Sequence, residues 1–188
     1  MEKNIAFQRH IVVSATVKRI AILGAESTGK STLAAALAAQ FQTVWVPEYL
    51  REFVEVHQRT PHADEQLAIA TTQIEREEKA VLYAQRFLFC DTTPILTAIY
   101  SDHYFGKADY KLESIATRHT YAATIVTAPT TPWIADGLQR ESDTVRQRIH
   151  ALLIRKLQDN DLPYLLIDGT TQDRIKQVVR LLDQLDND

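Results

Sequence analysis

The chain has 188 residues, which is enough for one ordinary domain with a sizeable core. Its formal net charge of −3 comes from acids and bases spread along the sequence, so it lacks the basic stripe of a nucleic-acid-binding protein. Cys90 is the only cysteine, which excludes intramolecular disulfides and cysteine-rich zinc sites. No stretch approaches the roughly 20 apolar residues of a membrane span, and residues 1–16 lack a signal-peptide core.

These features predict a cytoplasmic domain with no nucleic-acid and no membrane partner, and they leave a homo-oligomer open. We expect a single domain over 1–188, with a short N-terminal extension at 1–17. Short apolar runs alternate with amphipathic helical patterns, which is typical of βαβ units. The fold class predicted is α/β, with a five-stranded parallel sheet, about seven helices on its two faces, and strands at 19–23, 43–46, 87–90, 123–127 and 164–167.

A glycine-rich loop follows the first predicted strand and precedes a helix rich in Ala and Leu. Gly24-x-x-x-x-Gly29-Lys30-Ser31 satisfies the phosphate-loop pattern G-x-x-x-x-G-K-[ST] in full. In such a loop, backbone N–H groups surround phosphate oxygens, and the lysine reaches the β- and γ-phosphates. We therefore predict a three-layer P-loop NTPase fold that binds ATP and Mg²⁺ through Gly24, Ala25, Glu26, Ser27, Thr28, Gly29, Lys30, Ser31 and Thr32.

A second acid belongs at the end of a strand next to the loop, where it holds Mg²⁺ directly or through water. Asp91 supplies it, after the apolar run 87–90. Aspartate at a strand end is also a common turn former, but the complete phosphate loop favours a metal or substrate role. We predict Ser31 and Asp91 as the metal-binding residues.

Several classes of nucleotide enzyme are disfavoured. The chain has no Asn-Lys-x-Asp guanine reader and no transporter signature, and it is short for a motor ATPase with a helical lid domain. A small kinase remains, and its acceptor hydroxyl needs a carboxylate at the carboxyl edge of the sheet. Glu48 follows the second predicted strand, with Arg51 three residues later. The alternative is that Glu48 only complements the dipole of the next helix.

The longest irregular segment begins at Pro129 and runs to about residue 143. In a phosphate-transferring enzyme such a segment can close over the phosphates and expel water. We therefore predict a lid at about 129–143, with a plain surface connection as the alternative.

Four motifs in one order carry a family resemblance over most of the chain from residue 19 onward. They are the run 22–31, Glu48-Tyr49-x-Arg51-Glu52-Phe53, Asp91-Thr92, and Thr131-Pro132-Trp133-Ile134-Ala135-Asp136-Gly137-Leu138. Together they resemble the ribosylnicotinamide kinase domain of NadR-type regulators of NAD synthesis. The resemblance implies phosphoryl transfer from ATP to the 5′-hydroxyl of nicotinamide riboside, without the DNA-binding and adenylyltransferase domains of longer family members.

The resemblance also implies roles for individual residues. Glu48, Lys30, Asp91 and a lid arginine, Arg140, would be catalytic. The family's tryptophan before the Glu-Tyr pair is Pro47 here; Trp45 lies two residues earlier on the same strand face and either stacks on the acceptor ring or belongs to the core. The substrate-binding residues predicted are Trp45, Glu48, Tyr49, Arg51, Asp91 and Tyr104.

Tyr104 belongs to an aromatic cluster with Tyr100, Phe105 and Tyr110, which either lines an acceptor pocket or covers a helix end. The charged run 75–79 is predicted to be a solvated helix face. Two other functions stay open at this point. One is a deoxynucleoside kinase, and the other is a non-catalytic ATP-binding sensor.

Overall fold

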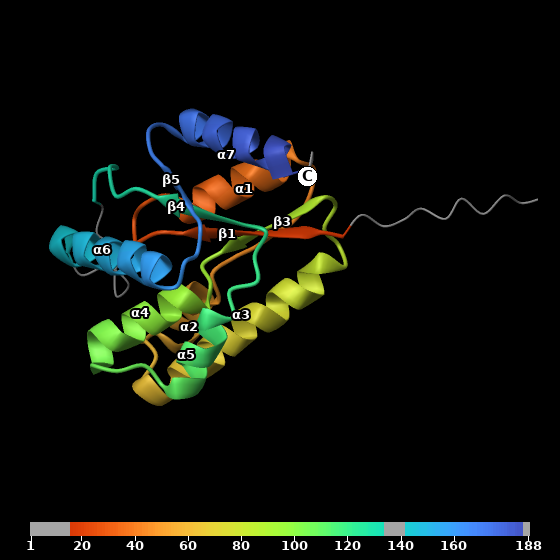
Figure 1. Ribbon diagram of the computed structural model, residues 1–188. Coiled ribbons are helices and arrows are strands. Elements are labelled where there is room, and N and C mark those ends of the chain that lie inside the picture. Colours follow the sequence, from red (N-terminus) through yellow and green to blue (C-terminus); the bar gives the residue numbers. More distant parts are fainter. Residues whose placement is uncertain (1–15, 134–141, 186–188) are drawn as a thin grey trace, which may run out of the picture.

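The computed structural model describes residues 16–133 and 142–185 (Figure 1). Within these residues, five strands form one sheet with the order β2-β3-β1-β4-β5, and every neighbouring pair is parallel. The predicted five-stranded parallel sheet is therefore confirmed. The strands are β1 (Lys18–Leu23), β2 (Trp45–Val46), β3 (Phe87–Asp91), β4 (Ala123–Thr127) and β5 (Leu165–Ile167).

Helices cover both faces of the sheet. Figure 1 shows α1 and α7 on one face and α3, α4, α5 and α6 on the other. A single turn of 3-10 helix, η1 (Ala63–Glu65), precedes α3. The helices are α1 (Lys30–Gln40), α2 (Tyr49–His57), α3 (Gln66–Val81), α4 (Pro94–Phe105), α5 (Tyr110–Thr117), α6 (Asp143–Asp159) and α7 (Thr171–Leu185).

The central strand β1 contributes to a separate apolar core on each face. Ile20 and Ile22 pack with α1 and α7, whereas Ala21 and Leu23 pack with α3, α4, α5 and α6. Successive side chains of a strand point to opposite faces, so an unbroken apolar run is what a strand covered on both faces requires. The phosphate loop follows β1 directly and is thus anchored to the best-buried part of the molecule.

The strand bounds differ from the sequence prediction mainly at β2, which is two residues long instead of four. Thr43 lies beside β3 but uses its side chain there: its Oγ1 donates to the carbonyl of Phe87 (2.7 Å) and accepts from the N–H of Gln85 (2.9 Å). A hydroxyl that competes for backbone partners shortens the regular ladder.

The charged run 75–79 is not wholly solvated, and this prediction was wrong for Glu77. The inner face of α3 carries Gln66, Ile69, Ala70, Gln73 and Glu77, and Glu77 is fully buried. These positions follow the three- and four-residue spacing of one helix face. The acids and bases on either side of Glu77 concealed that it lies on the buried stripe.

The described residues leave three sequence predictions untested. Most of the 1–17 extension and most of the predicted lid, including Arg140, lie outside the described residues, and the single-domain assignment also stays a prediction. Among the described residues, every helix is too short or too polar to cross a membrane.

The buried Glu77 predicts an unusual dependence of stability on pH. Burial raises the pKa of Glu77 to about 7, although the Tyr121 hydroxyl donates to its carboxylate (2.7 Å) and Arg19 opposes the shift. A folded-state pKa above the unfolded value of about 4.5 means that the stabilisation is present at low pH and is lost as pH rises toward 7.

We therefore expect Glu77→Gln to be more stable than wild type at pH 8 and close to it at pH 5. The change in the stability difference between the two pH values should be on the order of 2–3 kcal/mol. Urea unfolding of both proteins at both pH values measures it, and titration of other groups cancels in the comparison. A stability difference that does not change with pH would contradict the assignment.

Candidate active site

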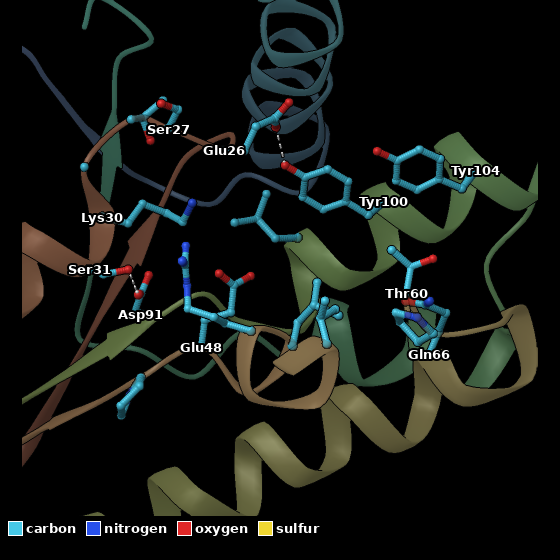
Figure 2. Close-up of a pocket in the computed structure, with 18 of the residues that line it drawn as sticks. Glu26, Ser27, Lys30, Ser31, Glu48, Thr60, Gln66, Asp91, Tyr100 and Tyr104 are labelled. Carbon is cyan, nitrogen blue, oxygen red and sulfur yellow. Dashed lines mark hydrogen bonds between the residues drawn. The ribbon is translucent and has the colours of Figure 1, made fainter. Parts of the chain in front are cut away.

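A cavity of about 870 Å³ opens at the carboxyl edge of the sheet (Figure 2). The phosphate loop forms one side of it, and the ends of β2 and β3, helix α2 and helix α4 form the others. Ligands of open α/β sheets bind at this edge, where the strand order reverses. The lining includes Glu26, Ser27, Thr28, Gly29, Lys30, Ser31, Thr32, Trp45, Pro47, Glu48, Leu50, Arg51, Val54, Gln66, Asp91, Leu96, Tyr100, Tyr104 and Phe105.

The loop adopts backbone conformations that explain its glycines. Gly24 has φ +150°, and a Cβ atom there would lie 2.2 Å from Thr127 Oγ1. Gly29 has φ +84° and is the N-cap of α1. Both positions favour a residue without a side chain. The first turn of α1 therefore begins inside the loop, with its N–H groups available to an anion.

Two side chains from distant elements hold the loop in place. The hydroxyls of Thr28 and Thr127, the last residue of β4, hydrogen-bond to each other (2.6 Å). The buried guanidinium of Arg174 on α7 donates to the carbonyl of Thr28 and, through Nε, to the carbonyl of Gly169 (3.0 Å). Arg174 was not predicted as a site residue, because an arginine in an amphipathic C-terminal helix has no local sign of burial.

Lys30, Ser31 and Asp91 come together at the floor of the cavity. The Lys30 ammonium donates to the carbonyl of Ala25 (3.0 Å), and Ser31 Oγ donates to Asp91 Oδ2 (2.5 Å). The carboxylate of Asp91 is 1% exposed, and burial raises its pKa to about 6, although Lys30 opposes the shift. The predicted juxtaposition of the loop with the end of β3 is thus present.

The same residues suit a hard divalent cation. Asp91 Oδ1 is buried and makes no hydrogen bond within the described residues, and the neighbouring Ser31 adds a hydroxyl oxygen. Mg²⁺ prefers one or two such protein oxygens and completes its shell with water and phosphate. The donor set therefore fits the predicted metal role of Ser31 and Asp91.

Glu48 and Arg51 line the cavity beside this floor. Glu48 is the N-cap of α2, but its side chain makes no capping hydrogen bond. In Figure 2 its carboxylate points into the cavity, on the side where Lys30 and Asp91 lie. The negative charge of Glu48 raises the pKa of Asp91, and the positive charge of Arg51 lowers it. The alternative, that Glu48 only complements the dipole of α2, needs no hydrogen bond and stays open.

Aromatic and apolar side chains form the wall opposite the loop. Tyr100 and Tyr104 stack with their ring centroids 6.1 Å apart and their planes 10° from parallel. The Tyr100 hydroxyl donates to Glu26 Oε2 (2.6 Å), so the acidic side chain of the phosphate loop faces α4 (Figure 2). Trp45 lines the cavity and also packs on the core under α1 and α7. The core alternative is thus present, and the stacking of Trp45 on an acceptor ring stays a prediction.

Some predicted site residues lie elsewhere. The Tyr49 ring lies under the guanidinium of Arg76 (4.4 Å) and packs against the cluster of Phe53, Val54 and Ile69 instead of lining the cavity. Tyr110 is 73% exposed and is likewise not part of the lining.

Gly24 and Ala25 are buried and are not part of the cavity lining. The apolar lining residues Leu50, Val54 and Leu96 were likewise not predicted from the sequence. Their chemistry is that of any core residue, and only the tertiary structure brings them to the cavity.

The base of the predicted lid contacts the phosphate loop. Thr131 Oγ1 donates to the carbonyl of Ser27 (2.9 Å), and Arg146 on α6 donates to the carbonyl of Thr131 (2.8 Å) and to Asp143 (2.7 Å). The two described ends of the segment are thus held together beside the loop. Whether the segment closes as a lid stays a prediction.

Comparison with known proteins identifies relatives. A family described as AAA domain matches residues 19–174. The trifunctional NAD biosynthesis/regulator protein NadR of Escherichia coli K12 is 30% identical over 175 residues, which are 90% of this chain and 43% of that protein. NadR of Salmonella typhimurium LT2 gives the same values. The chain therefore spans less than half the length of these curated relatives.

Solved structures share the fold. NadR in complex with NR superimposes with a TM-score of 0.76 at 23% identity, covering 88% of this chain and 51% of that chain. NadR in complex with NAD and AMP-PNP gives a TM-score of 0.72 at 22% identity, with coverages of 88% and 49%. Thymidylate kinase from Candida albicans gives 0.67 at 15% identity, with coverages of 92% and 93%.

Substituting the first glycine of the loop tests its conformation. We expect Gly24→Ala to abolish ATP binding and to cost at least about 2 kcal/mol of stability, because the methyl group would overlap Thr127 at an unfavourable φ. Gly106→Ala is the matched control: it has φ +80° but no atom within 4 Å of the added Cβ. It should cost only about 1 kcal/mol and keep ATP binding. Urea unfolding and calorimetric titration with ATP measure both effects, and equal behaviour of the two variants would refute this account.

Proposed function

We propose that this chain, which belongs to the AAA domain family of P-loop proteins, is an ATP-dependent nucleoside kinase. Its first-choice acceptor is nicotinamide riboside, and the product is then nicotinamide mononucleotide. The observation that carries the proposal is one cavity in which Glu48 faces Lys30, Ser31 and Asp91. The NadR relatives, described as proteins of NAD biosynthesis, and the NadR structure in complex with NR support this acceptor.

The phosphate loop holds the triphosphate of ATP. Its backbone N–H groups and the start of α1 supply positive potential to the phosphate oxygens, and Lys30 reaches the β- and γ-phosphates. Ser31 and Asp91 would hold Mg²⁺, which supplies charge neutralisation to the transferring phosphate. Because Thr127 and Arg174 fix the loop from behind, little of this arrangement has to form when ATP binds.

Glu48 orients the acceptor hydroxyl. The 5′-oxygen attacks the γ-phosphorus, a new phosphorus–oxygen bond forms, and the bond from the γ-phosphorus to the bridging oxygen breaks to release ADP. The hydroxyl proton passes to the Glu48 carboxylate. Arg51 lies beside Asp91 and helps balance the negative charge that two carboxylates and a triphosphate bring together.

The aromatic wall receives the ring of the acceptor. Trp45, Tyr100 and Tyr104 present π-faces or edges to the cavity, and a cationic pyridinium ring binds such faces favourably. Apolar side chains of α2 and α4 complete the wall and exclude water from the reacting groups. A cytoplasmic location, where ATP and nucleosides are available, is part of the proposal.

A panel of acceptors tests the proposal directly. With ATP and Mg²⁺, we expect the protein to phosphorylate nicotinamide riboside with a kcat/KM at least about tenfold above that for deoxynucleosides. Mass spectrometry of the products and a coupled assay for ADP measure it. Product from deoxynucleosides alone would move the function to the deoxynucleoside kinases. Absence of product from every nucleoside would favour the non-catalytic ATP sensor.

The role of Glu48 is tested by removing its charge. We expect Glu48→Gln to keep the affinity for ATP and to lower kcat by about 10²–10⁴-fold, because an amide cannot accept the proton. Glu52→Gln is a matched control, since Glu52 lies four residues further along, is exposed, and pairs with Arg76 outside the cavity. Lys30→Ala should lose ATP binding itself. Turnover that is the same in Glu48→Gln and wild type would remove Glu48 from the mechanism.

A further inference from the structure

Gln73 is a buried polar side chain in the middle of α3, and it joins the start of α2 to the end of β3 in the candidate site. It is 4% exposed. Its Oε1 accepts a hydrogen bond from the backbone N–H of Tyr49 (2.8 Å), and its Nε2 donates to the backbone carbonyl of Asp91 (3.4 Å). One side chain thus contacts the backbone next to Glu48 and the backbone of Asp91 itself.

The two contacts fix the orientation of the amide. A backbone N–H can only donate and a backbone carbonyl can only accept, so the oxygen of Gln73 must face Tyr49 and the nitrogen must face Asp91. Glutamine offers one acceptor and one donor in this arrangement at every pH. Ionised glutamate would accept from Tyr49 but would repel the carbonyl of Asp91.

Both backbone groups lie where regular structure ends. Tyr49 is the first residue of α2, and its N–H is one of the helix-start donors that lack an intrahelical partner. The side chain of Glu48, the N-cap, makes no capping bond. Pairing of β2 with β3 stops at Cys90, and Pro47, which follows β2, has no N–H to offer. Gln73 therefore takes the place of both a helix cap and a ladder partner.

The packing around Gln73 also places it close to Glu48. Gln73 lines a small cavity of about 20 Å³ together with Glu48, Gln66, Thr92 and Tyr100. Three of these residues, Glu48, Gln66 and Tyr100, also line the main cavity, so Gln73 lies close to the site. The apolar residues of α3 that flank it pack in two different cores, Ile69 against α2 and Ala70 against α4, so the helix itself is held from both sides.

We propose that Gln73 is a positioning residue that sets the separation of the Glu48 and Asp91 carboxylates. The proposal rests on the proposed kinase function, because that function gives the separation its importance: one carboxylate orients the acceptor and the other serves the phosphate end. Gln73 touches neither substrate. It acts through the backbone that carries the two acids, and a misplacement of about 1 Å at such a site costs up to about 100-fold in rate.

Two variants separate the two hydrogen bonds. Gln73→Leu removes both, and Gln73→Glu, assayed at a pH at which its buried carboxyl group is ionised, keeps the acceptor for Tyr49 but removes the donor to Asp91. We expect kcat to fall about 10-fold to 100-fold in both variants. The affinity and stoichiometry of ATP binding should stay within about twofold of wild type, because the phosphate loop is held by other residues. Hydrogen exchange of the Tyr49 amide should accelerate in Gln73→Leu and stay slow in Gln73→Glu.

Two controls distinguish positioning from a general loss of structure. Val178→Ala removes core volume on α7, and Thr71→Ala changes an exposed residue of α3. Both should keep wild-type kcat per ATP-binding site. The proposal is overturned if the Gln73 variants keep wild-type kcat per ATP-binding site, or if their kcat and ATP stoichiometry fall together. If Gln73→Leu does not fold, the kcat of Gln73→Glu per ATP-binding site tests the proposal in its place.

Failure of the proposed kinase function would give a different result from failure of the Gln73 proposal. If the wild-type protein phosphorylates no nucleoside, the proposed function fails, and with it the catalytic importance of the separation. The Tyr49 exchange rate then still decides whether Gln73 holds the start of α2. Rapid exchange in wild type, or slow exchange in Gln73→Leu, would overturn that structural part on its own.

Discussion

Parallel pairing of β1 with β3 is the constraint on which the candidate site depends. The register places Ile22 opposite Asp91, so the strand that leads into the phosphate loop ends beside the strand that ends in the acid. Ser31 and Asp91 are sixty residues apart in sequence but form a 2.5 Å hydrogen bond. A shift of one residue would turn Asp91 to the other face of the sheet. The two-sided core of β1 makes such a shift costly, because it would bury the wrong side chains on both faces.

The proposed nucleotide side of the cavity comes from one segment of the chain, whereas the proposed acceptor side comes from several. A single run of eight residues supplies the phosphate cradle, and Thr127 and Arg174 only support it from behind. The acceptor side takes its residues from β2, α2, α3 and α4, and no one segment determines its shape. Small changes in the packing of these helices can therefore reshape this side of the cavity without affecting the phosphate loop. This chain shares its fold with NadR at 23% identity and with thymidylate kinase at 15% identity.

The same difference explains what could be predicted from the sequence. The phosphate loop, Asp91 and the strand at 123–127 follow from local patterns, because a short motif or an apolar run contains the whole signal. Tyr49 shows the limit: it adjoins Glu48, but the start of a helix rotates its ring out to Arg76. Gln73 and Glu77 lie on a polar-looking helix whose buried face is evident only once α2, α4 and β3 are packed against it.

Helix α3 buries three polar residues, Gln66, Gln73 and Glu77, on the face that packs against the sheet and its neighbouring helices. A helix that packed with an apolar stripe alone would be easier to stabilise, since each buried polar group must recover the hydrogen bonds that it loses to water. Gln73 recovers them from backbone groups that no neighbouring strand or helix can satisfy, and Glu77 recovers one from Tyr121. Gln73 therefore lies where β2 and β3 end and where the sheet cannot complete its own ladder, whereas Glu77 lies beside Tyr121, which precedes β4. Those same strand ends carry Glu48 and Asp91, so the gap in regular structure that makes room for a substrate also creates the need for Gln73.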